Sequence, residues 1–438
     1  MLAYVIDNPA ASEVRVKTDM AFPMVLGVLF FVVYTQGYIE RIGVSSAVVK
    51  ILVETPVFLI LMHLINRGVS RWAPGLLWIV MYAIWTMVSA IYNGDSMFVA
   101  LLYCRYVIYG YVVFAATWST PLTKTAVTHL NTTIALLFLL QIAASAHEVF
   151  VRGERVEAHV GALYADGGAM ATEFPLLAMA LVVPLYLYYR ENPGILVLAW
   201  IFFLVGYASG KRAIYLFGPS LYFLILGWHV VEARTWPALR RLLRGSVVFL
   251  GLAPLLLFGV TQSKGISLSG PGGIVERTVY AWQRAREYNS REDRSGQTEG
   301  RMATSQRVLV SLLQGNEATA LFGWGPSAVM GRGGRFDTLR IAYGITGWTR
   351  DAISIGLPGM ALYLLFHVCL FQWLRRAGFR ARSGYWPALY FGTKAAFGVL
   401  LMCHLCYSSS LPTCGQLSYV YFYLVALLAS PNHTHLVG

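Results

Sequence analysis

Charged residues are scarce in this sequence. Asp, Glu, Lys and Arg make up 13% of its 438 residues, whereas apolar residues make up 57%, and the mean hydropathy is +0.58. Such a balance excludes a soluble globular protein of this length. Apolar windows of about 17 to 23 residues recur along the chain, and a helix of that length crosses the roughly 30 Å hydrocarbon layer of a bilayer with its backbone groups satisfied internally. The composition therefore predicts an all-α polytopic membrane protein.

The sequence also lacks an early apolar run and an internal repeat. The first twenty residues carry Asp7, Glu13, Arg15, Lys17 and Asp19, so a cleaved signal peptide is not expected and the first span has to direct the chain to the membrane. Without a fixed repeat period, residues 1–438 are interpreted as one transmembrane domain. The apolar windows predict twelve spans, near 21–38, 45–66, 74–93, 97–117, 127–146, 171–189, 194–209, 213–232, 246–262, 353–374, 386–406 and 417–430.

Acidic pairs and histidine clusters of the kind that bind metals are missing as well. The chain has no D-x-D or E-x-D pair, and its predicted outer loops have no histidines at ligand spacing. A divalent cation that holds a diphosphate needs such oxygen ligands, so no metal site is predicted. The stretch "CHLC" at 403–406 lies in a predicted span without a second ligand pair and is not interpreted as a metal site.

The basic residues predict the orientation of the chain. The N-terminus and the short loops on one side of the membrane hold fourteen Lys and Arg, whereas the short loops opposite hold five. Short loops rich in Lys and Arg stay cytoplasmic. Both termini are therefore expected in the cytoplasm. A small loop at 147–170 and a large loop at 263–352 are expected on the outer face.

The basic excess of the large loop consists almost entirely of arginine. Twelve Lys and Arg, eleven of them Arg, stand against eight Asp and Glu. Guanidinium suits bidentate recognition of phosphate, although any single arginine is as well explained by a solvated surface. Apolar residues at helical spacing predict amphipathic helices over 272–289 and 301–315, so the loop is expected to cap the bundle. The glycines of "GWGPSAVMGRGGRF" (323–336) are expected to allow tight turns, because no βαβ unit precedes them as a nucleotide site requires.

Charges inside membrane spans are costly and are therefore usually paired or functional. Glu54 and Arg105 each lie about 12 Å from the outer end of a predicted span, at about 1.5 Å per residue. We expect them to pair, either as a structural ion pair or as part of a path to a site. Lys394 lies nearer the middle of its span, and the sequence offers no partner for it.

Two further carboxylates open predicted spans from the outer side. Glu173 lies at the start of the sixth span, and Asp351 follows Arg350 just before the tenth. A carboxylate at a helix start complements the helix dipole. The alternative is an acid or base in a site.

Three stretches in a fixed order resemble a known family. The first has a Gly- and Asp-containing start of a mid-chain span, the second a small-Ser-x-Arg-small motif, and the third a loop arginine, a "FGWGP" turn and a GxxG return to the membrane. They are "GALYADGGAMATEFPLLAMALVVPLYLY" (161–188), "YASGKRAIYL" (207–216), and "SQRVLVSLLQGNEATALFGWGPSAVM" (305–330) with "SIGLPGMALYLL" (354–365). With the twelve-span layout, this set resembles the O-antigen ligase and O-antigen polymerase superfamily of bacterial membrane glycosyltransferases, which have the GT-C architecture.

The resemblance implies an inverting, metal-independent glycosyltransferase without a cofactor, in the bacterial inner membrane, whose active site faces the periplasm. Its substrate is a polyprenyl-diphosphate-linked oligosaccharide within membrane lipid. The expected protein partner is a chain-length regulator or a flippase. Binding of nucleic acid is not expected. The large loop contains no histidine, whereas ligases of the family usually carry one there. A polymerase of O-antigen, capsule or exopolysaccharide is therefore favoured over a ligase that transfers the glycan to lipid A core or another acceptor. A transporter of lipid-linked sugars or solutes is the alternative from another class, and it predicts inverted repeats with broken helices.

The resemblance also implies roles for individual residues. Arg212 and Arg307 match the family arginines that hold the diphosphate, and Lys211 and Arg350 are expected to complete this anion clamp. Each contact at about 4 Å is worth on the order of 4 kcal/mol before desolvation at an effective dielectric near 20. The base that takes the proton of the acceptor hydroxyl is expected to be either Glu173 or Asp351.

Overall fold

The structure is a computed structural model that describes most of the chain. The described residues are 21–68, 73–151, 163, 170–189, 192–208, 212–233, 236–237, 239–241, 243–248, 251, 279, 301–329, 345–377, 384–406 and 415–433. Its α-helices are α1 (Ala21–Arg41), α2 (Ser46–Arg67), α3 (Leu76–Tyr92), α4 (Met97–Ser119), α5 (Lys124–Phe150), α6 (Met170–Tyr188), α7 (Pro193–Ala208), α8 (Arg212–Ala233), α11 (Arg301–Gln314), α12 (Glu317–Phe322), α14 (Gly347–Ala377), α15 (Trp386–Cys406) and α16 (Gly415–Ala429). Two 3-10 helices are η2 (Pro326–Val329) and η3 (Pro431–His433).

The described elements are helices throughout, and many are apolar. Six helices are long and apolar enough to cross a membrane, namely α1, α2, α4, α5, α14 and α15, and α3, α6, α7 and α16 contain shorter apolar helices. The predicted all-α, multi-pass membrane fold is thus confirmed. Helices occupy eleven of the twelve predicted windows, and the remaining window, 246–262, lies largely outside the described residues.

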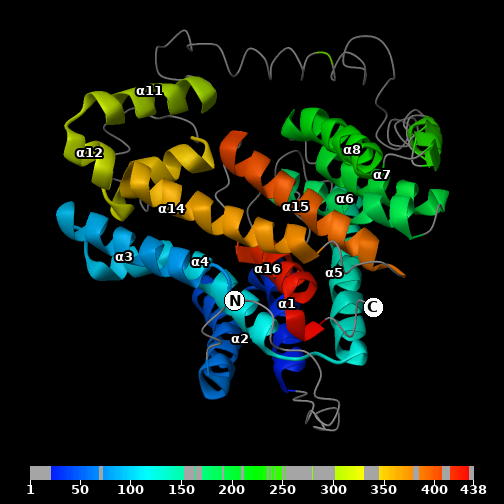
Figure 1. Ribbon diagram of the computed structural model, residues 1–438, viewed down its shortest axis with the longest axis horizontal. Helices are drawn as coiled ribbons and strands as arrows, with labels where there is room; N and C mark the ends of the chain where they lie inside the picture. The colour runs from blue at the N-terminus through cyan, green and yellow to red at the C-terminus, as the bar shows by residue number, and fades with distance from the viewer. Residues whose placement is uncertain are drawn as a thin grey trace, which may run out of the picture.

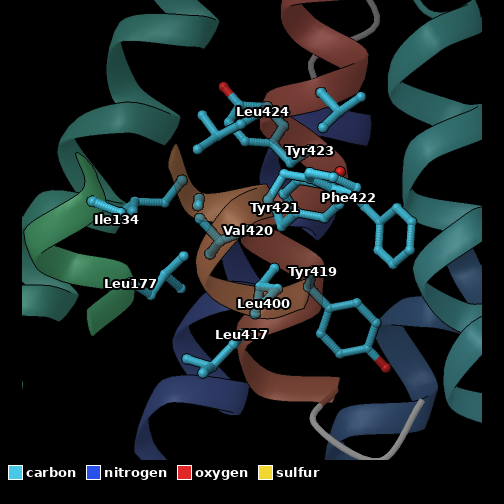
Figure 2. Close-up of a cluster of buried hydrophobic side chains, with 14 of the residues drawn as sticks. Ile134, Leu177, Leu400, Leu417, Tyr419, Val420, Tyr421, Phe422, Tyr423 and Leu424 are labelled. Atoms are coloured by element: carbon cyan, nitrogen blue, oxygen red, sulfur yellow. The ribbon is translucent and has the colours of Figure 1, made fainter. Parts of the chain in front are cut away.

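Helix α16 lies inside the bundle. Every side chain from Leu417 to Ala429 is buried, as expected for a helix that is apolar or aromatic on all faces. Figure 2 shows its side chains among Ile134 of α5, Leu177 of α6 and Leu400 of α15. Helices α1, α4 and α14 pack against it as well, so α16 is the element around which the others assemble.

Glycines bring neighbouring helices close together. A Cβ on Gly110 of α4 would lie 2.3 Å from the Phe422 ring of α16, and a Cβ on Gly392 of α15 would lie 3.2 Å from Leu181 Cα of α6. Both approaches need the space that a missing side chain leaves. As a result, α15 lies between α6 and α14 with contacts to both.

One end of the bundle carries Glu173, Arg350 and Asp351 of the predicted site. We call it the site end, and define it by the first residues of α4 (Met97) and α14 (Gly347) together with the last residue of α15 (Cys406). Contacts between these helices, described below, place their ends together. In Figure 1, α11 and α12 lie beside the first part of α14, and α12 also contacts α3.

The large loop agrees with the sequence expectation in one segment and differs in another. Helix α11 coincides with the amphipathic helix predicted at 301–315. Helix α14 begins at Gly347, whereas the predicted span begins at 353. The charges of Arg350 and Asp351 indicate a loop in the sequence, but burial and hydrogen bonding accommodate them in a helix. The helix predicted at 272–289 lies outside the described residues apart from Val279.

Candidate functional site

The site is built on an interruption in α14. Gly356 has φ 73° and ψ 176°, outside the helical region. A Cβ at this position would lie 1.9 Å from the carbonyl oxygen of Leu321, so glycine alone fits. The interruption divides α14 into a first half, residues 347–355, and a second half, residues 357–377. The "GLPG" stretch is therefore a break between two helical segments.

The carbonyl groups that the break releases all find donors. The backbone N–H of Trp324 donates to Ile353 O at 2.7 Å. The Ser89 hydroxyl lies 2.5 Å from Phe322 O and 3.1 Å from Ser354 O and shares its one proton between them. The Trp85 indole N–H donates to Ile355 O at 2.8 Å. Buried backbone acceptors are costly when they lack a donor. These bonds therefore hold the first half of α14 in a fixed direction against α3.

The "FGWGP" turn forms the other wall of this junction. Gly323 and Gly325 have φ of 69° and 91°, so the predicted tight turns are present here. A Cβ on Gly323 would lie 2.4 Å from Ile353 O, and a Cβ on Gly325 would lie 2.4 Å from Asp95 Oδ2. Asp95 accepts bonds from the backbone N–H of Ser327 at 2.9 Å and from its hydroxyl at 2.5 Å. The turn is thereby fixed to the loop between α3 and α4.

The first half of α14 presents Asp351 to two other helices. The carboxylate is 1% exposed. The Tyr103 hydroxyl of α4 donates to its Oδ1 at 2.8 Å, and His404 Nε2 of α15 lies 3.4 Å from its Oδ2. A buried carboxylate is costly unless it is hydrogen-bonded or paired. Tyr103 supplies one such contact, whereas Oδ2 has no hydrogen-bond partner among the described residues and His404 Nε2 lies beyond the distance of a well-aligned hydrogen bond.

Arg350 and Arg307 of the predicted clamp differ in exposure and in the element that carries them. Arg350 is half-buried, and its charge acts on Asp351. Arg307 is exposed on α11. Helix α11 is fixed to the start of α14 by a bond of 3.1 Å between the Ser305 and Thr346 hydroxyls. Arg307 therefore belongs to the cap over the site end.

Glu173, the other predicted acid, is carried by a different helix, α6. It is in the first turn of α6 and is 1% exposed. Its carboxylate acts electrostatically on Cys403, the residue next to His404. Since His404 contacts Asp351, the two predicted acids approach the last turn of α15 from different helices. The structure thus brings both to the site end.

The remaining predicted clamp residues lie where α7 joins α8. Arg212 is the first residue of α8. Its side chain and the whole of Lys211 lie outside the described residues. A Cβ on Gly206 of α7 would lie 2.8 Å from Ile214 of α8 and 3.2 Å from Pro175 of α6. The last turns of α7 therefore pack against the start of α6, the helix that carries Glu173.

Two ion pairs contain the charges that were predicted deep inside spans, namely Glu54, Arg105 and Lys394. Arg105 Nη1 lies 3.2 Å from Glu54 Oε1, and its Nη2 donates to the Tyr106 hydroxyl at 2.8 Å. Lys394 pairs with Glu232 of α8, and its Nζ lies 4.3 Å from the centre of the Trp228 ring. The second pair joins α8 to α15, a partnership that the sequence did not suggest.

No protein-family model matches the chain, and no curated protein is significantly similar to it.

Sequence reasoning missed Tyr103 and His404. Tyr103 is one of 26 tyrosines, and nothing in its local sequence marks it. His404 stands in "CHLC", whose side chains face different surroundings: Cys403 is buried and Cys406 is exposed. A polar, ionisable ring inside an apolar span was the signal that could have identified His404.

Proposed function

We propose that the protein is an inverting, metal-independent membrane glycosyltransferase that polymerises polyprenyl-diphosphate-linked oligosaccharide units into a surface polysaccharide. In this proposal the chain has twelve spans in a GT-C-like arrangement in the bacterial inner membrane. Both termini are cytoplasmic, and the site end faces the periplasm.

The observation that carries the proposal is the environment of Asp351. Its carboxylate is buried at the end of the bundle, where it accepts a hydrogen bond from Tyr103 and lies 3.4 Å from His404 Nε2, with Arg350 next to it in the chain. A general base needs a carboxylate that is fixed in position and shielded from bulk water. In the proposed reaction, Asp351 takes the proton of the acceptor hydroxyl as its oxygen attacks the anomeric carbon from the face opposite the diphosphate, which inverts the configuration.

The leaving diphosphate requires cations on the other side of the reacting sugar. When the anomeric C–O bond breaks, its electron pair moves onto the diphosphate, and cations placed there stabilise the transition state more than the ground state. We assign this role to Arg350 and Arg307, together with Lys211 and Arg212 at the start of α8. Glu173 is assigned to the acceptor side as the second acid.

A transporter of lipid-linked sugars remains the second candidate because of one observation. Broken helices are typical of transporters, whose substrate sites they line, and α14 is broken at Gly356. The two functions differ in a measurable way, because a transporter moves its substrate unchanged whereas a glycosyltransferase forms a new bond.

The test uses the purified full chain in lipid vesicles with lipid-linked repeat units. Elongation without another acceptor supports a polymerase. Transfer only to an added lipid A core or other acceptor contradicts the polymerase and supports a ligase. Movement of intact lipid-linked units across the vesicle membrane, with no new glycosidic bond, contradicts the enzyme and supports the transporter.

A further inference from the structure

The end of α12 lies against the side of α3. The Phe322 ring stacks on the Tyr92 ring, with 4.5 Å between the ring centres, and on the Trp85 ring at 5.4 Å. Ser89, between these two aromatic residues on α3, has its hydroxyl 2.5 Å from Phe322 O. Helix α3 ends at Tyr92, so Ser89 lies about 4.5 Å and Trp85 about 10 Å from this end, at about 1.5 Å per residue. Phe322 therefore lies beside the last two turns of α3.

These turns belong to a helix whose exposed face suits acyl chains. Helix α3 contains no charged residue, and the polar stretch 93–96 follows it. Its exposed side chains are apolar or aromatic and recur every three or four positions, as in a helix face that contacts lipid. They are Leu77, Val80, Met81, Ile84, Val88, Ile91 and Tyr92. Since Tyr92 ends this stripe and stacks on Phe322, the stripe leads directly to α12.

The exposed face of α12 changes from charged to apolar within one turn. Glu317 and Leu321 are four residues apart, so they lie on the same face of the helix, and both are exposed. Glu317 is in the first turn of α12, whereas Leu321 directly precedes Phe322. A single exposed leucine is ordinary on a surface in water. Leu321, however, is 45% exposed next to the residue that extends the stripe of α3.

The turn after α12 keeps its backbone groups bonded within the protein. Besides the contact to Phe322 O, the N–H of Gly323 donates to Thr319 O at 2.9 Å, and the N–H of Trp324 donates to Ile353 O at 2.7 Å. Non-helical backbone at membrane depth is tolerated only where it is buried in protein, and Gly323 is buried. The turn thus meets the requirement for a segment that enters the hydrocarbon layer.

We propose that residues 317–325 form a re-entrant segment whose tip enters the hydrocarbon layer beside α3. Leu321 contacts the acyl chains of the bilayer, and Glu317 stays in water. The bilayer is the partner of this surface because the exposed apolar stripe of α3 continues onto Leu321. Through Trp324 and Ile353, the segment supports the first half of α14 from the side of the membrane. The inference does not depend on the proposed glycosyl transfer.

The test places a nitroxide on a single cysteine, in a background without the native cysteines and with the protein in lipid bilayers. The substitutions are Leu321→Cys, Glu317→Cys and, as the lipid-facing reference on α3, Ile84→Cys. All three positions are exposed, so the label meets no packed neighbour. Oxygen concentrates in hydrocarbon, whereas a nickel chelate stays in water. We expect the label at 321 to collide often with oxygen and rarely with the chelate, as at 84, and the label at 317 to show the reverse. Chelate collisions as frequent at 321 as at 317 overturn the proposal.

A second measurement compares Leu321→Glu with Leu321→Ala by thermal unfolding in bilayers. An exposed position in water accepts either substitution with little effect, whereas a carboxylate in hydrocarbon is costly. We expect Leu321→Glu to lower the melting temperature clearly more than Leu321→Ala. Failure of Leu321→Glu to fold while Leu321→Ala folds supports the proposal as well. Equal shifts for the two substitutions overturn it.

Discussion

At the scale of single residues, Asp351 depends on side chains that lie far away in the sequence. Tyr103 is 248 residues from Asp351, yet its hydroxyl lies 2.8 Å from Oδ1. A buried acceptor that loses its donor costs about 1 to 3 kcal/mol. The tyrosine hydroxyl therefore determines both the position of the carboxylate and the cost of burying it.

Replacement of Tyr103 by phenylalanine tests this contact. We expect Tyr103→Phe to lower the rate of bond formation by about 10- to 100-fold, which corresponds to the energy of one hydrogen bond to a charged group. The measurement is kcat/KM with lipid-linked repeat units. Tyr419→Phe is the matched control, because the Tyr419 hydroxyl of α16 is buried without a hydrogen-bond partner among the described residues. Equal effects of the two substitutions would contradict the role of Tyr103.

Residues could be predicted from the sequence where a charge stands out against an apolar background. Glu54, Arg105, Glu173 and Asp351 were all identified in this way. Tyr103 could not be, because its role comes from the packing of α4 against α14 and not from its neighbours in sequence. The partner of Lys394 was missed for the same reason, since Glu232 lies at the end of another predicted span.

At the scale of elements, the break in α14 positions the site. Without the break, the first half of α14 would continue along the axis of the second half. Asp351 would then not lie beside α4 and α15. The break depends on Gly356, because the backbone of the "FGWGP" segment passes directly against it.

Alanine at position 356 should therefore be poorly tolerated. A Cβ 1.9 Å from Leu321 O, at φ 73°, forces the backbone to move. We expect Gly356→Ala to lose both thermal stability and activity, with a cost of at least about 3 kcal/mol. Gly227→Ala is the control, since a Cβ on this helical glycine meets nothing within 4 Å. A Gly356→Ala protein with normal thermal stability and activity would refute the importance of the break.

The ion pair between α8 and α15 gives an asymmetric prediction. The Lys394 side chain is 4% exposed and that of Glu232 is 37% exposed. Glu232→Gln leaves a buried cation without its anion, whereas Lys394→Met leaves a carboxylate that can reach solvent. We expect Glu232→Gln to lower the melting temperature more than Lys394→Met, and the double substitution to recover part of the loss. The opposite order would show that Lys394 is not held by this pair.

The sequence predicted the helices better than their ends. Apolar windows mark a span because the bilayer requires about 20 apolar residues in a row. They do not mark the first half of α14, where the buried Asp351 accepts a hydrogen bond from Tyr103 of another helix. Helix α11 was predicted because its apolar residues repeat at helical spacing.

At the scale of the whole molecule, the account requires the site end to face away from the cytoplasm. Cysteines introduced at two exposed positions test this, in a background without the native cysteines. The substitutions are Glu317→Cys and Asn192→Cys. Position 317 lies in α12 at the site end, and position 192 lies in the turn between α6 and α7. We expect a membrane-impermeant thiol reagent added to intact cells stripped of their outer membrane to label the cysteine at 317 and not the one at 192. The reverse pattern would invert the orientation.

The most direct test of the central claim compares Asp351→Asn with the unchanged protein in vesicles that contain lipid-linked repeat units. Glu317→Gln, which removes an exposed carboxylate of the cap, is the matched control, and thermal unfolding verifies that each variant is folded. The account predicts that Asp351→Asn loses about 10²- to 10⁴-fold in kcat while Glu317→Gln retains normal turnover. A folded Asp351→Asn protein that forms glycosidic bonds at the normal rate would contradict it.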